Sequence, residues 1–231
     1  MSAHASSPGS ARPRTCVYID GFNLYYGALR KTSFRWLDLD AFCRLLLPRN
    51  DIHRIKYFTA RVVPRPGKPN TAVRQQTYLR ALATLASVEV YYGHYLSHPR
   101  WMPLAAPGGG VLVDAAGKVQ FAQVLRQEEK GSDVNLAAHL LHDAHRGEFE
   151  IGVVISNDSD LATPIELVTR DLGLPVGVVN PRAMNPDSRQ SKQLRRAASF
   201  LKEVRPGGLR KCQFPPVLVD SDGMFSKPAA W

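Results

Sequence analysis

Four aspartates lie where predicted strands end or a predicted helix begins. Asp20 ends a short β-branched and aromatic run, Asp133 opens a helical pattern, and Asp158 and Asp160 follow an apolar run. In a parallel α/β sheet the functional crevice lies beyond the carboxyl ends of the strands, so these side chains are expected to converge there. Close carboxylates repel one another and take up protons unless a cation is present. Mg²⁺ or Mn²⁺, which favour oxygen ligands, are therefore the expected cofactors.

A divalent ion held by carboxylates suits hydrolysis of phosphodiester bonds. Such an ion generates hydroxide from water and stabilises the charge that develops on the phosphate. Each aspartate also has a structural explanation, because Asp20 precedes a glycine and the other three stand where helix N-terminal residues are expected. We favour the metal site because all four positions fall at element ends.

Apolar runs alternate with helical patterns along the chain. Strands are predicted at 15–20, 52–63, 88–95, 149–156, 174–179 and 199–204, and helices at 37–47, 71–85, 133–145, 161–172 and 188–198. Ser132 is expected to cap the helix that Asp133 opens. The strands are continuously apolar, which predicts an α/β fold with a mostly parallel central sheet and helices on both faces.

The length of 231 residues and the composition indicate one domain with a further segment at each end. Residues 1–13 are expected to be a disordered arm, 14–205 the domain, and 206–231 a partly extended tail rich in Pro and Gly. Within the domain, Val111–Val113 and Val119–Phe121 flank a turn, which predicts an inserted hairpin inside 97–127.

The composition argues for a cytoplasmic protein that does not enter a membrane. No apolar run approaches the ~18 residues that a membrane span requires. The first fifteen residues lack the apolar segment of a signal peptide. Three cysteines at unrelated spacings suggest neither a disulfide framework nor a metal site, so a reducing cytoplasm is expected.

Three segments that contain these aspartates resemble the signature blocks of NYN domains, which belong to the PIN-like nucleases. They are VYIDGFNLYYG, KGSDVNLAAHLL and VVISNDSDLATPI, in the expected order, and the resemblance covers roughly residues 14–204. It implies a Rossmann-like three-layer sandwich and metal-dependent cleavage of RNA. The residues that match the family's acidic positions, and so are implied to be catalytic and metal-binding, are Asp20, Asp133, Asp158 and Asp160.

The same resemblance implies supporting roles for three neighbours of the aspartates. Asn23 is expected to fix the loop or contact substrate, Ser156 to lie beside the metal, and Lys130 to pair with a phosphate. One position departs from the family, since many relatives have an Asp where this chain has His139. Six residues of helix separate this position from Asp133 by ~9 Å along the axis. The number of bound metal ions therefore stays open.

Two other kinds of site are less favoured. His139, His142 and His145 recur every three residues, but this spacing drifts around a helix and no ligand set is complete. A phosphatase of the haloacid dehalogenase type would need an acid two residues after Asp20, where this chain has Phe22.

The charge favours a nucleic-acid partner. The formal net charge is +10 at pH 7, and basic chains bind polyanions. Arg195 and Arg196 are expected to contact substrate phosphates, as members of a basic stretch whose Lys and Arg residues are Arg182, Arg189, Lys192, Arg195, Arg196, Lys202, Arg205, Arg210 and Lys211.

The predicted function is a metal-dependent endoribonuclease that acts on single-stranded RNA, whose splayed bases and flexible backbone fit an open crevice. The alternative is an RNA-binding or regulatory module that keeps the fold but does not cut. A monomer and a homodimer both remain possible on the sequence alone.

Overall fold

The computed structural model of the chain describes residues 11–64, 67, 69–181 and 190–231. Most of the expected N-terminal arm, residues 1–10, lies outside the described residues. So do Arg182, Arg189 and the first two residues of the helix expected at 188–198.

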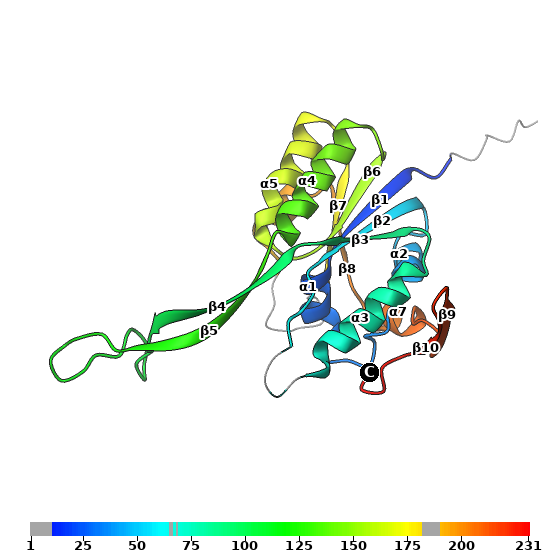
Figure 1. Cartoon of the computed structure of the whole chain (residues 1–231). Helices are drawn as coiled ribbons and strands as arrows, with labels where there is room; N and C mark the ends of the chain where they lie inside the picture. Colours follow the sequence, from blue (N-terminus) through cyan, green and yellow to red (C-terminus); the bar gives the residue numbers. More distant parts are fainter. Residues whose placement is uncertain (1–10, 65–66, 68, 182–189) are drawn as a thin grey trace, which may run out of the picture.

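A six-stranded parallel sheet forms the centre of the molecule, in the order β3-β2-β1-β6-β7-β8 (Figure 1). Its strands are β1 (Arg14–Asp20), β2 (Asp51–Thr59), β3 (Val88–Tyr92), β6 (Ile151–Ile155), β7 (Val176–Asn180) and β8 (Phe200–Glu203). Both its order and its parallel pairing confirm the predicted α/β fold. β2 ends at Thr59 rather than at residue 63, because the Gln75 side chain bonds the backbone of Ala60 and Val62 and draws the chain away from the sheet.

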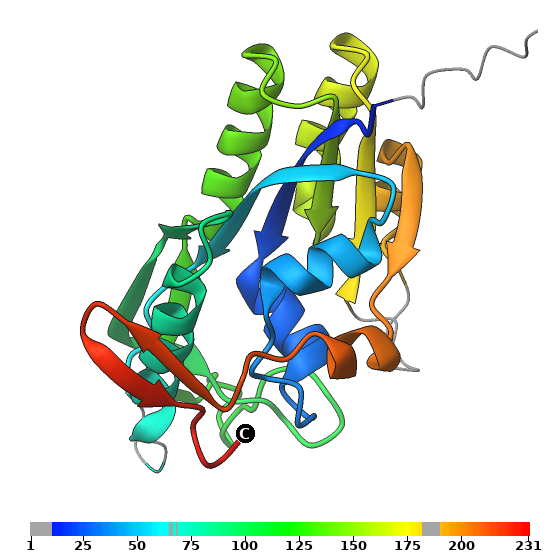
Figure 2. The same ribbon diagram turned by 90° about the vertical axis from the view of Figure 1, so that its right-hand side faces the viewer.

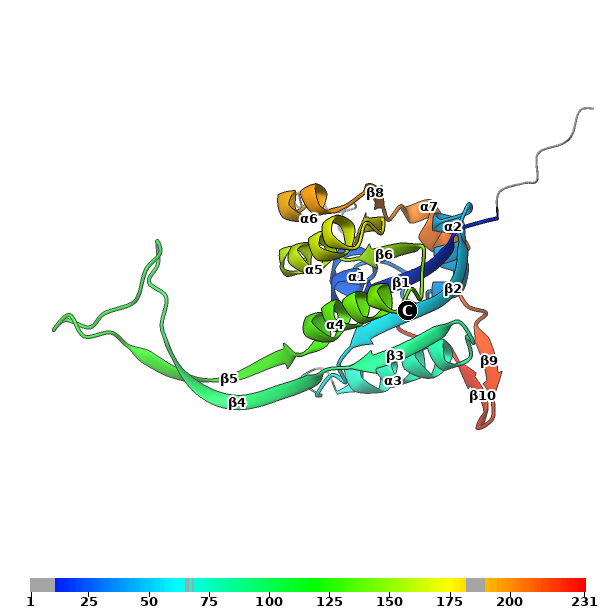
Figure 3. The same ribbon diagram turned by 90° about the horizontal axis from the view of Figure 1, so that it is seen from above.

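Helices cover both faces of this sheet (Figure 3). Alternate side chains of a strand point to opposite faces, so Val17 and Ile19 of β1 join one core cluster while Cys16 and Tyr18 join the other. The first cluster is covered by α1 (Gly21–Leu24), η1 (Tyr25–Leu29), α2 (Leu39–Leu46), α3 (Asn70–Ala83) and α7 (Pro206–Lys211), and the second by α4 (Ser132–His145), η2 (Ser159–Leu161), α5 (Ala162–Glu166), η3 (Leu167–Asp171) and α6 (Lys192–Ala197). The result is the predicted three-layer sandwich. None of the helices in the described residues is long and apolar enough to cross a membrane.

A long two-stranded arm leaves the sheet after β3. The strand expected at 88–95 breaks at Gly93 into β3 and β4 (His94–Pro103), and β4 pairs antiparallel with β5 (Phe121–Lys130). Figures 1 and 3 show this arm projecting away from the sandwich. The predicted hairpin inside 97–127 is present, but its main strands are β4 and β5, and the expected strand segments contribute mostly the isolated bridges Ala105–Val111 and Val113–Val119. Pro99 and Pro103 made the β4 segment look like a loop in the sequence. Proline is nevertheless tolerated in edge strands such as β4.

The segment expected to be a partly extended tail contains regular elements. It forms α7 and a hairpin of β9 (Val217–Asp220) and β10 (Gly223–Ser226), which lies beside α3 (Figure 2). Arg80 of α3 binds both carboxylate oxygens of Asp220 at 2.6 Å. Trp231 packs against the buried Trp36, with ring centroids 6.1 Å apart. These contacts join residues far apart in sequence, so composition alone could not predict them.

Candidate active site

The register of the sheet brings Asp20 next to Ser156. Ile19 of β1 is paired with Ile155 of β6, so the residues that follow them leave neighbouring strands side by side at the carboxyl edge. The Ser156 hydroxyl donates to Asp20 Oδ2 at 2.9 Å, and the backbone N–H of Asn23 donates to Asp20 Oδ1 at 2.9 Å. Both oxygens of Asp20 are therefore fixed, and Asp20 also serves as the N-cap of α1.

The loop after β6 holds the second acidic pair. Ser156 Oγ accepts a hydrogen bond from the Asp158 N–H at 3.0 Å, and Asp158 Oδ1 accepts one from the Asp160 N–H at 3.0 Å. The Asn23 side chain spans the two loops, because its Oδ1 accepts the N–H of Asn157 at 3.3 Å. Asn23 is thus placed to fix the loops.

Asp133 comes from the other side, in the first turn of α4. The helix begins one residue earlier than expected, at Ser132, and Gly131 rather than Ser132 occupies the N-cap. Glu129 also belongs to this helix end, because its Oε1 accepts the Ser132 N–H at 3.0 Å. This hydrogen bond satisfies one of the free N–H groups in the first turn of α4. The Ser132 side chain was expected to cap the helix in this way. The only sequence signal for Glu129 is its position three residues before the helix.

Gly93 allows the root of the arm to approach this helix end. A Cβ at Gly93 would lie 2.5 Å from the Lys130 carbonyl oxygen and 2.8 Å from Glu129 Oε1. Only glycine fits between these atoms. The arm therefore borders the acidic site at its root, whereas its tip lies far from it (Figure 1).

The carboxylates influence one another electrostatically. Burial, and then the charges of Asp20, Asp158, Glu129 and Asp160, raise the pKa of Asp133 to about 7. Burial also raises the pKa of Asp20, against the hydrogen bonds from Asn23 and Ser156. A carboxyl group that titrates near neutral pH is typical of functional sites.

The donor set fits a hydrated divalent ion rather than an all-protein cage. Within the described ranges, no three His, Cys, Asp or Glu side chains are grouped closely enough to hold a metal ion. Mg²⁺, however, usually keeps several waters and is bound by one or two carboxylates. The buried Ser132 hydroxyl, beside Asp133 in the chain, has no hydrogen-bond partner among the described residues. An unpaired buried hydroxyl is costly.

Other predicted residues lie apart from this network. Lys130 ends β5 and has its Nζ 3.5 Å from a carboxylate oxygen of Glu128. Arg195 and Arg196 are exposed on α6, a helix joined to the acidic loop by the Ser191 N–H, which donates to Asn157 Oδ1 at 2.9 Å. The structure thus leaves their proposed phosphate contacts as predictions.

His139 lies on the sheet rather than among the four aspartates. Its Nδ1 is 3.3 Å from Lys56 Nζ, and its ring packs on Tyr91 with centroids 4.1 Å apart. Lys56 in turn forms a buried ion pair with Asp143 at 2.7 Å. His139, at which this chain departs from the family, is therefore part of a structural network with Tyr91 and the Lys56–Asp143 ion pair.

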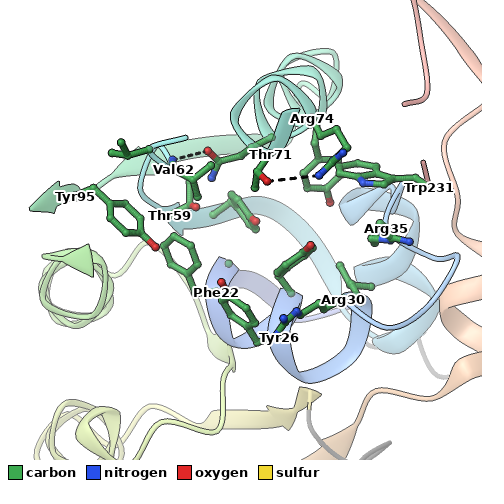
Figure 4. A pocket seen from close by; sticks show the side chains of 17 residues that line it. Phe22, Tyr26, Arg30, Arg35, Thr59, Val62, Thr71, Arg74, Tyr95 and Trp231 are labelled. Carbon is green, nitrogen blue, oxygen red and sulfur yellow. Dashed lines mark hydrogen bonds between the residues drawn. The ribbon is translucent and has the colours of Figure 1, made fainter. Parts of the chain in front are cut away.

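A pocket of about 400 Å³ lies against the other side of α1 (Figure 4). Gly21 and Phe22, which directly follow Asp20, form part of its wall together with Tyr57. A Cβ at Gly21 would lie 2.6 Å from the Tyr57 ring, so glycine is required for this close contact. The charge of Asp20 contributes to a raised pKa of Tyr57, after burial as the main cause. The pocket is therefore close to the acidic site.

The family comparison agrees with this geometry. A model of the NYN domain matches residues 14–202, which include the whole central sheet except the last residue of β8. The chain belongs to the NYN domain family. This places it among PIN-like nuclease folds and confirms the family predicted from the three sequence blocks.

This NYN protein is similar to one known protein in sequence and to another in fold. It is 30% identical over 237 residues to 6-hydroxy-3-succinoylpyridine 3-monooxygenase HspA of Pseudomonas putida, across 94% of this chain and 75% of the relative. A crystal structure of a protein of unknown function from Vibrio parahaemolyticus matches 87% of this chain and 98% of its own, with a TM-score of 0.53 and 16% identity. At that identity the second likeness concerns the fold alone.

Proposed function

We propose that this NYN protein is a metal-dependent endoribonuclease that hydrolyses phosphodiester bonds of single-stranded RNA. The observation that supports it most is that four aspartates from three separate segments influence one another, because the charges of Asp20, Asp158 and Asp160 add to burial in raising the pKa of Asp133. Family membership supports the general class of nuclease.

The proposed roles follow from the hydrogen bonds. Asp20 is held rigidly by Ser156 and the Asn23 N–H, so it can present a fixed carboxylate. In the metal-free protein Asp133, with a pKa of about 7, holds or releases a proton at neutral pH, and a bound cation would favour its charged form. Mg²⁺ or Mn²⁺, held among the four aspartates by one or two direct carboxylate bonds and by waters, would supply an activated water and neutralise the phosphate.

RNA binding is proposed from charge and position. Arg195 and Arg196 are exposed on α6, which is tied to the acidic loop, so they can receive phosphates of a strand that crosses the site. We place the activity in the cytoplasm, because all three cysteines are buried free thiols, as is usual in a reducing compartment.

The test is cleavage of an end-labelled single-stranded RNA by the purified protein, with Mg²⁺, with Mn²⁺ and with EDTA. We expect cuts only with a metal ion, leaving 5′-phosphate and 3′-hydroxyl ends, and none with Asp20→Asn. RNA that binds without being cut under any of these conditions would instead favour the non-cleaving RNA-binding module.

A second candidate function is oxygenation of a small aromatic compound. Its support is the activity named for the Pseudomonas relative, together with the aromatic pocket beside α1. In such a reaction one atom of O₂ enters the ring, and the other becomes water with two electrons from a reductant such as NADH. The test is incubation with 6-hydroxy-3-succinoylpyridine, O₂ and NADH, followed by mass spectrometry. Absence of a hydroxylated product and of substrate-dependent NADH oxidation would exclude it.

A further inference from the structure

The pocket beside α1 has the chemistry of a ligand site that lies apart from the four aspartates. Its volume of about 400 Å³ falls in the range of small-molecule sites. Three arginines line it, from the segment after α1 and from α3, namely Arg30, Arg35 and Arg74. No Asp or Glu is among its described lining residues.

The three guanidinium groups are held in place without neutralisation. Arg35 Nε donates to the Thr32 carbonyl at 2.9 Å, and the Arg30 guanidinium lies over the Tyr26 ring at 5.4 Å. Within the described part of the chain, none of the three arginines forms an ion pair with a carboxylate. Convergent cations without counter-charges favour an anion, and a guanidinium fork matches carboxylate or phosphate oxygens.

Aromatic rings provide the rest of the wall. Phe22 stacks on Tyr26 with centroids 6.4 Å apart and meets the edge of Tyr95 at 6.0 Å. In Figure 4 Arg35 and Arg74 appear on the side of Trp231, Arg30 appears beside Tyr26, and Tyr95 appears on the side opposite Trp231. A ligand with a flat ring at one end and an anionic group at the other would match both ends.

We propose that this pocket binds a planar aromatic ring that carries an anionic group. Such a ligand can come from two sources, a nucleotide or a small aromatic acid. The proposal does not depend on RNA cleavage, because the pocket lining contains none of the four aspartates, and it names the ligand class of the pocket that supports the second candidate function.

The experiment is titration calorimetry of the full chain in EDTA, which prevents metal-bridged binding at the aspartates. The probes are 5′-AMP and 2-naphthoate, each paired with its uncharged counterpart, adenosine and 2-naphthamide. We expect at least one anionic probe to bind once per chain, at least tenfold more tightly than its counterpart. Binding of AMP alone identifies the nucleotide source, and binding of naphthoate alone identifies the small acid.

Variants locate the binding. Arg35→Gln combined with Arg74→Gln should weaken the anionic probe at least tenfold, because charge-assisted hydrogen bonds are lost. Arg49→Gln, which removes an exposed arginine before β2 at the opposite end of the sheet, should leave the Kd unchanged. Tyr26→Leu, at a ring 50% exposed and therefore tolerant of substitution, should weaken binding severalfold.

The failure of this proposal is distinct from failure of the nuclease. Lack of binding by both anionic probes at millimolar concentration would overturn it, and so would an unchanged Kd in the folded double arginine variant. Asp20→Asn should retain probe binding even where it loses cleavage. A protein that cuts RNA but binds neither probe would contradict only the pocket.

Discussion

Replacing Asp133 by Asn should stabilise the metal-free protein at alkaline pH. Burial and the neighbouring carboxylates raise the pKa of Asp133 from 3.8 to about 7. The charged form is therefore less stable in the folded chain than in the unfolded chain. The resulting penalty begins as the pH rises above the unfolded value of 3.8, and it is complete above about 7. Asn cannot ionise and carries no such penalty.

The magnitude follows from the size of the shift. Each pKa unit corresponds to about 1.4 kcal/mol, so the whole shift amounts to about 4 kcal/mol. Asp133 is only half-buried, and solvent screening reduces this to about 1–2 kcal/mol. The variant also loses the favourable placement of a negative charge at a helix N-terminus, about 0.5 kcal/mol. The net gain in the free energy of unfolding at pH 8 should be about 1 kcal/mol.

The assay is urea unfolding in EDTA at pH 5 and at pH 8, with Asp171→Asn as the control at an exposed carboxylate. The gain from Asp133→Asn should be less than half as large at pH 5, where much of the penalty has not yet developed. Millimolar Mg²⁺ at pH 8 should stabilise the wild type more than the variant, because only the wild type keeps the full ligand set. A variant that is less stable than the wild type at pH 8, or a gain that is the same at both pH values, would refute the reasoning.

Three further outcomes are expected. Ser156→Ala should lower the RNA cleavage rate about 10–100-fold by releasing Asp20 Oδ2, while Ser159→Ala should not; equal rates for both variants would contradict this role. Lys56→Met should cost about 3–5 kcal/mol in urea unfolding, because it leaves the buried Asp143 with the Tyr18 hydroxyl as a donor but without its counter-charge, and a loss below 1 kcal/mol would exclude a tightly coupled pair. Gly21→Ala should lower the melting temperature, since a methyl group would meet both the Tyr57 ring and the Phe58 carbonyl oxygen; an unchanged value would contradict the close packing of α1 on β2.

The sandwich was predictable because its strands are continuous apolar runs. Both faces of β1 are buried, so Cys16 to Ile19 are all apolar or aromatic, and the sequence signal is strong. Placement of Asp20 and Ser156 at one edge also follows from parallel pairing, which sequence patterns do predict. The catalytic role of the four aspartates is still a prediction, since the geometry brings them together without showing a reaction.

The features that sequence patterns did not predict depend on contacts between distant residues. Trp231 closes the pocket only because the segment after Pro206 folds back onto Trp36, some 200 residues earlier in the chain. Arg35 lies in a stretch with no regular helix or strand pattern, so its convergence with Arg74 could not be anticipated. The arm was only partly predicted, because prolines break the strand pattern in the sequence of β4. Its apolar side chains are also exposed to solvent, as shown by Trp101, whose exposed fraction is 64%.

The measurement that tests the central claim most directly is the single-turnover rate of RNA cleavage in Mn²⁺. It should compare the wild type with Asp158→Asn and with Asp171→Asn, a matched loss of one exposed carboxylate outside the site. We predict that Asp158→Asn loses at least 100-fold in rate and that Asp171→Asn equals the wild type. Cleavage by Asp158→Asn at the wild-type rate, or a rate that EDTA does not abolish, would contradict a metal-dependent site built on these aspartates.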